Sequence, residues 1–119
     1  MIEFGTMYKQ RDIIIIPIPF SDLKSTKKRP VVIVSNDIYN KKTEDIIVVA
    51  MTSNIEGKKD YSLLISNDDL EVGELKHKSM VRIDKIYTLN KSIVIKKFGT
   101  LKREVFCQIE KILQQLFTQ

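Results

Sequence analysis

Short runs of β-branched and other apolar residues, separated by polar stretches, recur along most of the 119-residue chain. Runs of this length and composition predict β-strands. We expect strands at 12–18, 30–35, 45–52, 61–66, 79–89 and 93–98. The basic segment 21–29 should be a mobile, solvated loop, and the polar segments 36–44 and 67–74 should be connections.

Two of these strands carry more specific patterns. Residues 12–18 are almost all isoleucine, which is typical of a strand covered on both faces, and Pro17 and Pro19 restrict its far end to a sheet edge or a bulge. Residues 79–89 alternate instead. The alternation puts Val81, Ile83, Tyr87 and Leu89 on one face and Arg82, Asp84 and Thr88 on the other.

The period changes to that of a helix near the C-terminus. Thr100 is a suitable N-cap, and the helix should begin at Leu101. Its apolar positions are Val105, Phe106, Ile109, Ile112, Leu113, Leu116 and Phe117. They span an arc of about 160°, more than one packing surface needs, so the helix either lies deep on the sheet or also faces a second subunit. The whole pattern predicts a mainly β fold, a small barrel with one C-terminal helix.

Composition excludes several classes of protein. With 43% hydrophobic and 29% charged residues, the chain should fold without disulfides or metal. Its single cysteine, Cys107, allows no internal disulfide and no zinc cluster, which favours the cytoplasm. Cys107 falls on the polar side of the predicted helix, opposite Ile109, so we interpret it as an incidental free thiol. No apolar run approaches the roughly 18 residues of a membrane span. Residues 3–6 read like translated restriction sites, so we interpret 1–7 as a vector-derived or disordered extension and 8–119 as one domain.

Familiar catalytic templates are also excluded. The only histidine, His77, rules out a two-histidine acid–base mechanism and is interpreted as a surface residue. Four unclustered glycines cannot form a phosphate-binding glycine loop. The acidic segment 67–74 has the character of a solvated turn, so we expect no metal site there.

The remaining chemistry lies where strands meet loops. Arg82 and Asp84 are two residues apart on one strand, so they share a face about 6.5–7 Å apart and could straddle a phosphodiester. The simpler interpretation is a surface ion pair worth less than about 1 kcal/mol. Arg29 belongs to a basic loop in a chain with a net charge of +5, which suits a polyanion. Thr52 ends the third strand. Three tyrosines are candidates for base stacking or for half-buried core positions: Tyr39, Tyr61 and Tyr87.

Five ordered blocks of sequence go further than these single residues. They read Asp12-Ile-Ile-Ile-Ile-Pro-Ile-Pro-Phe-Ser-Asp-Leu, Lys28-Arg29-Pro30-Val-Val-Ile-Val-Ser, Val49-Ala-Met-Thr52-Ser53, Lys78-Ser79-Met-Val-Arg82-Ile-Asp84-Lys-Ile and Phe98-Gly-Thr-Leu101. Together they resemble the PemK/MazF family of toxin endoribonucleases. The resemblance implies an SH3-like β-barrel of the CcdB/PemK/MazF type, a homodimer, and the toxin half of a type II toxin–antitoxin pair.

The resemblance also implies an activity and a site. Family members cleave single-stranded mRNA without metal or cofactor, by 2′-hydroxyl attack that leaves a 2′,3′-cyclic phosphate, and they reach DNA only through an antitoxin complex. By this resemblance Arg29 and Thr52 are catalytic, and Arg82 and Asp84 serve as acid and base. The RNA-binding residues would be Lys24, Lys27, Lys28, Ser53 and Lys85.

Departures from the family pattern leave alternatives open. Lys85, Tyr87 and Asn90 stand where MazF-type members usually carry glutamine, arginine and aspartate, which argues against a MazF-like sequence preference. Residues 21–28 replace the glycine-containing first loop of MazF, so the recognised RNA sequence cannot be transferred. The alternative is a barrel that binds RNA without cleaving it, or one that poisons gyrase as CcdB does, neutralised in either case by an antitoxin. A third reading is a groove that accepts only an antitoxin peptide.

Overall fold

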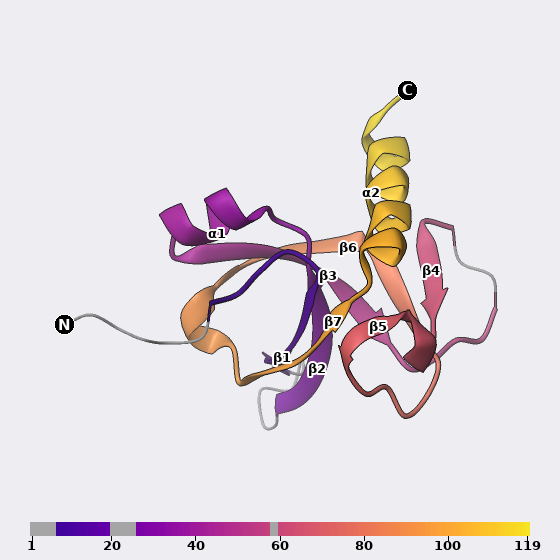
Figure 1. Cartoon of the computed structure of the whole chain (residues 1–119), viewed down its shortest axis with the longest axis horizontal. Helices are drawn as coiled ribbons and strands as arrows, with labels where there is room; N and C mark the ends of the chain where they lie inside the picture. The colour runs from indigo at the N-terminus through magenta and orange to yellow at the C-terminus, as the bar shows by residue number, and fades with distance from the viewer. Residues whose placement is uncertain (1–6, 20–25, 58–59) are drawn as a thin grey trace.

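Seven antiparallel strands form one strongly curled sheet in the order β4-β6-β3-β2-β1-β7-β5 (Figure 1). The computed structural model describes residues 7–19, 26–57 and 60–119. Its strands are β1 (Asp12–Pro19), β2 (Thr26–Ile33), β3 (Asp45–Thr52), β4 (Ser62–Ile65), β5 (Leu70–Gly73), β6 (Ser79–Asn90) and β7 (Lys96–Leu101), and its helices are α1 (Asp37–Lys42), α2 (Arg103–Phe117) and the 3-10 turns η1 (Asn67–Asp69) and η2 (Lys91–Ile93). The expected mainly β fold with a C-terminal helix is confirmed, as a half-barrel.

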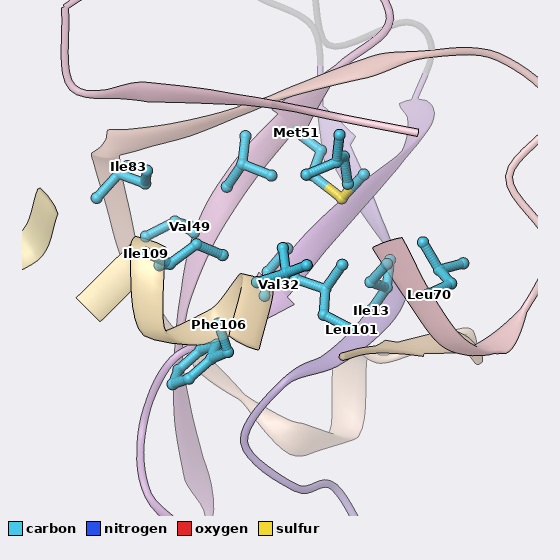
Figure 2. Close-up of a cluster of buried hydrophobic side chains, with 12 residues drawn as sticks. Ile13, Val32, Val49, Met51, Leu70, Ile83, Leu101, Phe106 and Ile109 are labelled. Carbon is cyan, nitrogen blue, oxygen red and sulfur yellow. The ribbon is translucent and has the colours of Figure 1, made fainter. Parts of the chain in front are cut away.

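The sheet carries a hydrophobic cluster on each face. The helix-side core consists of Ile13, Val32, Val49, Met51, Ile65, Leu70, Val81, Ile83, Leu101, Val105, Phe106 and Ile109. Phe106 and Ile109 of α2 cover this face of the sheet (Figure 2). The second core consists of Ile14, Ile16, Val31, Ile33, Ile46 and Val48. Because β1 contributes alternate isoleucines to both clusters, the prediction of a strand covered on both faces is confirmed.

The prolines of β1 lie where the sequence places them. β7 pairs with β1 only from Asp12 to Ile15, so the distal half of β1 is bonded to β2 alone. Pro17 and Pro19 fall in that half, opposite Lys28 and Thr26. A residue without an N–H is tolerated there because one side of the strand has no partner among the described strands.

The basic segment is not a loop throughout, which corrects one expectation. β2 begins at Thr26, so Lys27, Lys28 and Arg29 lie on a strand and pair with Ile18, Pro17 and Ile16. Pairing with β1 fixes the faces to which these basic side chains belong. Lys24 and the suspected extension up to residue 6 lie outside the described residues.

Both polar connections contain short elements that the sequence did not predict. Residues 36–44 include α1, which begins where the Asn36 side chain accepts a hydrogen bond of 2.8 Å from Tyr39 N. Inside this turn the buried Ser35 and Asn40 side chains bond each other. Residues 67–74 fold into η1 followed by β5. Local capping by asparagine was a readable signal for α1, whereas β5 depends on pairing with the distant β7.

The predicted helix start and the last predicted strand were both wrong by a few residues. Residues 91–93 form η2, and β7 extends through Thr100 to Leu101, so α2 begins at Arg103. Thr100 is not an N-cap, because its hydroxyl donates to Asp12 Oδ1 at 3.0 Å while Leu101 N donates to Arg11 O at 2.9 Å. Contacts with β1 and the turn before it therefore override the local capping preference. No helix in the described part of the chain is long and apolar enough to span a bilayer.

Candidate functional site

Arg82 and Asp84 of β6 form an ion pair, with 3.5 Å between Arg82 Nε and Asp84 Oδ1. Their side chains are 21% and 32% exposed, so both are partly shielded yet open to a ligand. Arg82 Nε is buried and has no hydrogen-bond partner within the described structure. The pair is therefore incompletely satisfied. A fully bonded structural ion pair would leave neither group available, whereas this one can take on a further acceptor or donor.

A bulge in β6 shapes this pair. Val49 of β3 lies opposite Ile86, but the next residue, Ala50, lies opposite Arg82. The β6 residues between them, 83–85, have no counterpart on β3, and Ile83 N donates instead to Tyr61 O at 3.0 Å. Bulges re-aim side chains and are common beside active sites. Asp84 and Lys85 thus project from the bulge rather than from a regular strand.

The bulge also corrects the predicted alternation of this strand. Val81 and Ile83 belong to the helix-side core as expected, but Leu89 packs on the second core, opposite Ile46. An odd number of extra residues exchanges the two faces downstream. Tyr87, opposite Val48, therefore shares the face of the second core with Leu89 and is separated from Val81 and Ile83.

Thr52 and Arg82 lie on the face of the second core. Arg82 is opposite Ala50, and directly opposed residues of an antiparallel pair point to the same side. Thr52, two residues beyond Ala50, shares that side, since strand residues alternate between faces. Diagonal neighbours of this kind are about 7–8 Å apart, within reach of a long side chain.

Arg29 reaches the same face from β2. Arg29 is paired with Ile16, a residue of the second core. On the other side of β2, Val31 is opposite Ala50 of β3. Continuing this register by two residues toward the start of β2 aligns Arg29 with Thr52. Arg29, Thr52 and Arg82 are each half-buried. Ala50, whose side chain is a single methyl group, lies between Arg82 of β6 and Val31 of β2.

The Thr52 hydroxyl is oriented by a local bond. Its Oγ1 accepts from Asn54 N at 3.1 Å, as in a turn that ends a strand. The hydroxyl proton remains available for donation to a ligand oxygen. Ser53 follows it in an exposed position.

The other basic candidates are divided between faces. Lys27, opposite Ile18, shares the face of Arg29, whereas Lys28, opposite Pro17, falls on the other face of β2. Lys85 is exposed on the bulge, and Lys24 is outside the described residues. The structure therefore places Lys27 and Lys85 on the sheet or bulge near the four candidate catalytic residues.

Other candidates from the sequence lie elsewhere. His77 and Cys107 are exposed, as expected. In residues 7–19, 26–57 and 60–119, no three His, Cys, Asp or Glu side chains are grouped to hold a metal ion. Sequence reasoning missed Ser62 of β4, which lies opposite Arg82 and is half-buried. No local signal identifies it, because its position depends on the β4–β6 register.

Comparison with known families gives a match over nearly the whole chain. Residues 9–117 match the PemK-like, MazF-like toxins of type II toxin–antitoxin systems. The chain belongs to this family. The family that the ordered blocks of sequence suggested is thus confirmed, and the protein is a PemK/MazF-like toxin. No match to a curated protein was found.

Solved structures show the same fold for this PemK/MazF-like toxin. An endoribonuclease from a mycobacterial species is similar with a TM-score of 0.72 and 22% identity, covering 95% of this chain and 93% of that one. A mycobacterial endoribonuclease in complex with its cognate antitoxin gives 0.73 and 19%, covering 91% and 92%. A MazE–MazF complex from Deinococcus radiodurans gives 0.72 and 16%, covering 93% and 96%.

Proposed function

We propose that this toxin is a metal-independent endoribonuclease that cleaves single-stranded mRNA by 2′-hydroxyl attack. The observation that carries the proposal is that Arg29, Thr52 and Arg82 lie on one face of the sheet, with Asp84 ion-paired to Arg82. The two guanidinium groups and the carboxylate supply the charges that such a reaction needs, and the hydroxyl supplies a hydrogen-bond donor. The endoribonucleases of similar fold support the same activity.

Each group has a role that follows from its chemistry. Asp84, with part of its carboxylate exposed, accepts the proton of the 2′-hydroxyl as the 2′-oxygen bonds to phosphorus. The bond from phosphorus to the 5′-oxygen breaks, and Arg82 neutralises the charge that develops on this leaving oxygen, which takes a proton from solvent. An arginine suits this electrostatic role because it stays charged at any working pH.

The remaining pair stabilises the phosphorane between these steps. Arg29 can grip two nonbridging oxygens with its planar fork, and Thr52 can donate its hydroxyl proton to one of them. Lys27, on the face of Arg29, and Lys85, on the bulge, would contact neighbouring phosphates, with Lys24 and Ser53 as further contacts. Lys28, on the other face of β2, has no contact with the scissile region in this arrangement. The products are a 2′,3′-cyclic phosphate and a 5′-hydroxyl.

The decisive experiment is incubation of the protein with single-stranded RNA in EDTA. We expect fragments with cyclic-phosphate ends, and we expect Arg29→Ala to lower the rate by about 10²- to 10³-fold, as loss of one oxyanion-stabilising donor does. Lys111→Ala, which removes one charge from an exposed position of α2, is the matched control. A gel shift with intact RNA would contradict cleavage and favour a binder. If the protein neither cleaved nor bound the RNA, a gyrase-directed toxin would be favoured.

A cognate antitoxin is the proposed protein partner, and the cytoplasm, where mRNA is available, is the proposed location. Structural relatives have been solved with antitoxins bound. Contact with DNA would occur only through the toxin–antitoxin complex. In the cleavage assay above, the purified product of the neighbouring gene should stop the reaction if it is the antitoxin.

A homodimer is the proposed assembly. The first half of α2 is buried on the helix-side core, but Phe117 near its end is 73% exposed, and Ile112, Leu113 and Leu116 are only half-buried. Ile112 and Leu113 still pack against the helix-side core, but Leu116 and Phe117 belong to neither core of the described residues. This apolar end of the helix favours a second subunit as the explanation for the wide stripe. The dimer would then contain two copies of the candidate site.

Light scattering tests the dimer directly. The wild-type protein should have twice the 13.8 kDa mass of one chain. Phe117→Glu should shift the mass toward that of one chain, since it places a charge in an apolar contact. Gln114→Glu adds the same charge at an exposed position of the same helix and should leave the mass unchanged. A wild-type mass of one chain would contradict the proposal.

A further inference from the structure

Tyr87 lies on the same face of the sheet as Arg82, although five positions along a regular strand would put them on opposite faces. The bulge causes this, because Tyr87 is opposite Val48 while Arg82 is opposite Ala50. Val48 and Ala50 are two residues apart on β3, a separation of about 6.5–7 Å. Without the bulge, the two β6 residues would be about 16–17 Å apart.

The surroundings of Tyr87 leave its ring accessible. Its cross-strand partner Val48 is fully buried and its strand neighbour Leu89 packs on the second core, yet Tyr87 itself is 45% exposed. Its hydroxyl makes no hydrogen bond to any described residue. The Tyr87 side chain therefore has accessible surface for a ligand and belongs to neither hydrophobic core.

The other tyrosines are placed differently. Tyr8 packs against the second core, and Tyr39 is half-buried on α1. Tyr61 is 42% exposed, but it lies just before β4, in a left-handed backbone conformation with φ 57°. Tyr8 therefore shares the face that carries Arg29, Thr52 and Arg82, but it is half-buried and precedes β1. Of the four tyrosines, Tyr87 is the one that lies on a strand, and it is both on that face and exposed.

We infer that Tyr87 forms a base-stacking subsite of the RNA-binding face, holding the base of a nucleotide next to the scissile phosphate. The inference rests on the proposed function and adds a binding determinant to it. Bases stack on aromatic side chains with a strength that corresponds to about 5- to 150-fold in affinity, whatever the base. A base next to a phosphate that the two arginines hold would be within reach of the ring. Along β3, the partners of Tyr87 and Arg82 are only two residues apart.

Kinetic measurements separate this binding role from chemistry. Tyr87→Ala should raise KM for RNA by about 5- to 150-fold with little change in kcat, because the ring contacts a base and not the reacting atoms. Tyr87→Phe keeps the ring and should behave as the wild type. An unchanged KM in Tyr87→Ala would overturn the subsite while leaving the proposed nuclease intact.

Fluorescence tests stacking without any cleavage. The chain has no tryptophan, so Tyr87→Trp places a single reporter at this position. Titration with a short, mixed-sequence 2′-O-methyl RNA should quench it, whereas the same strand with abasic residues should not. Gln108→Trp, at an exposed position of α2, the helix that covers the helix-side core, is the matched control and should show no quenching.

The possible results remain distinguishable. Quenching at position 87 together with intact RNA in the cleavage assay would retain the subsite and reject the nuclease. Cleavage without quenching by the base-bearing strand would reject the subsite alone. Equal quenching by the base-bearing and abasic strands would also reject it, since the signal would then report the backbone and not a stacked base.

Discussion

Replacing Asp84 with asparagine is expected to lower the rate of RNA cleavage by about 10²- to 10⁴-fold. Asparagine has the same shape and can still accept a hydrogen bond from Arg82, but it cannot take the proton of the 2′-hydroxyl. The variant should remain folded, because a partly exposed ion pair contributes less than about 1 kcal/mol to stability. Single-turnover cleavage in EDTA measures the rate, and thermal unfolding measures the fold.

The matched control for this variant is Asp68→Asn. Asp68 is an exposed acid on η1, so its substitution removes the same charge away from the bulge. It should cleave at the wild-type rate. Wild-type cleavage by Asp84→Asn would mean that another group takes the proton, and Arg82 and Asp84 would then be the surface ion pair of the simpler interpretation.

Replacing Asp12 with alanine is expected to lower the free energy of unfolding by about 2–4 kcal/mol. Asp12 is 1% exposed. Its Oδ1 accepts from the Thr100 hydroxyl at 3.0 Å and lies 3.3 Å from Lys97 Nζ, and its Oδ2 accepts from Lys9 N at 2.9 Å. These contacts tie β1 to β7 and to the turn before β1. The substitution leaves two donors without their acceptor.

Chemical denaturation measures this effect through the shift of the midpoint. Asp68→Ala, at the exposed position already used as a control, should change the free energy of unfolding by less than about 0.5 kcal/mol. Thr100→Val, which removes one of the donors but keeps the side-chain shape, should fall between the two. If Asp12→Ala were as stable as Asp68→Ala, the buried carboxylate would contribute nothing to holding the strands together.

Local periodicity was enough to locate most strands but not their partners. The strand predicted from the isoleucine run of β1 is confirmed, and Arg82 and Asp84 form the ion pair of the simpler interpretation. Thr100 was misread because its hydroxyl bonds Asp12, 88 residues away in sequence. β5 was missed because its four residues are a strand only through pairing with β7.

The candidate site shows the same division. Ordered sequence blocks made Arg29, Thr52, Arg82 and Asp84 candidates, but nothing local indicates that β6 contains a bulge. The bulge is visible only as a change of register against β3, so the position of Tyr87 beside Arg82 could not be predicted from alternation. For the same reason Lys27 and Lys28, adjacent in sequence, could not be assigned to different faces before the pairing of β2 was known.

The strand β1 has a consequence for where this molecule can open. Ile13 belongs to the helix-side core and Ile14 to the second core. Because both residues lie on β1, neither core can unfold without disturbing the strand that supports the other. Local unfolding is confined to elements with few such shared contacts. The face that bears Arg29 and Thr52 should therefore open only when the whole sheet unfolds. Any rearrangement on binding RNA should be confined to the β6 bulge, where Asp84 and Lys85 have no partner on β3.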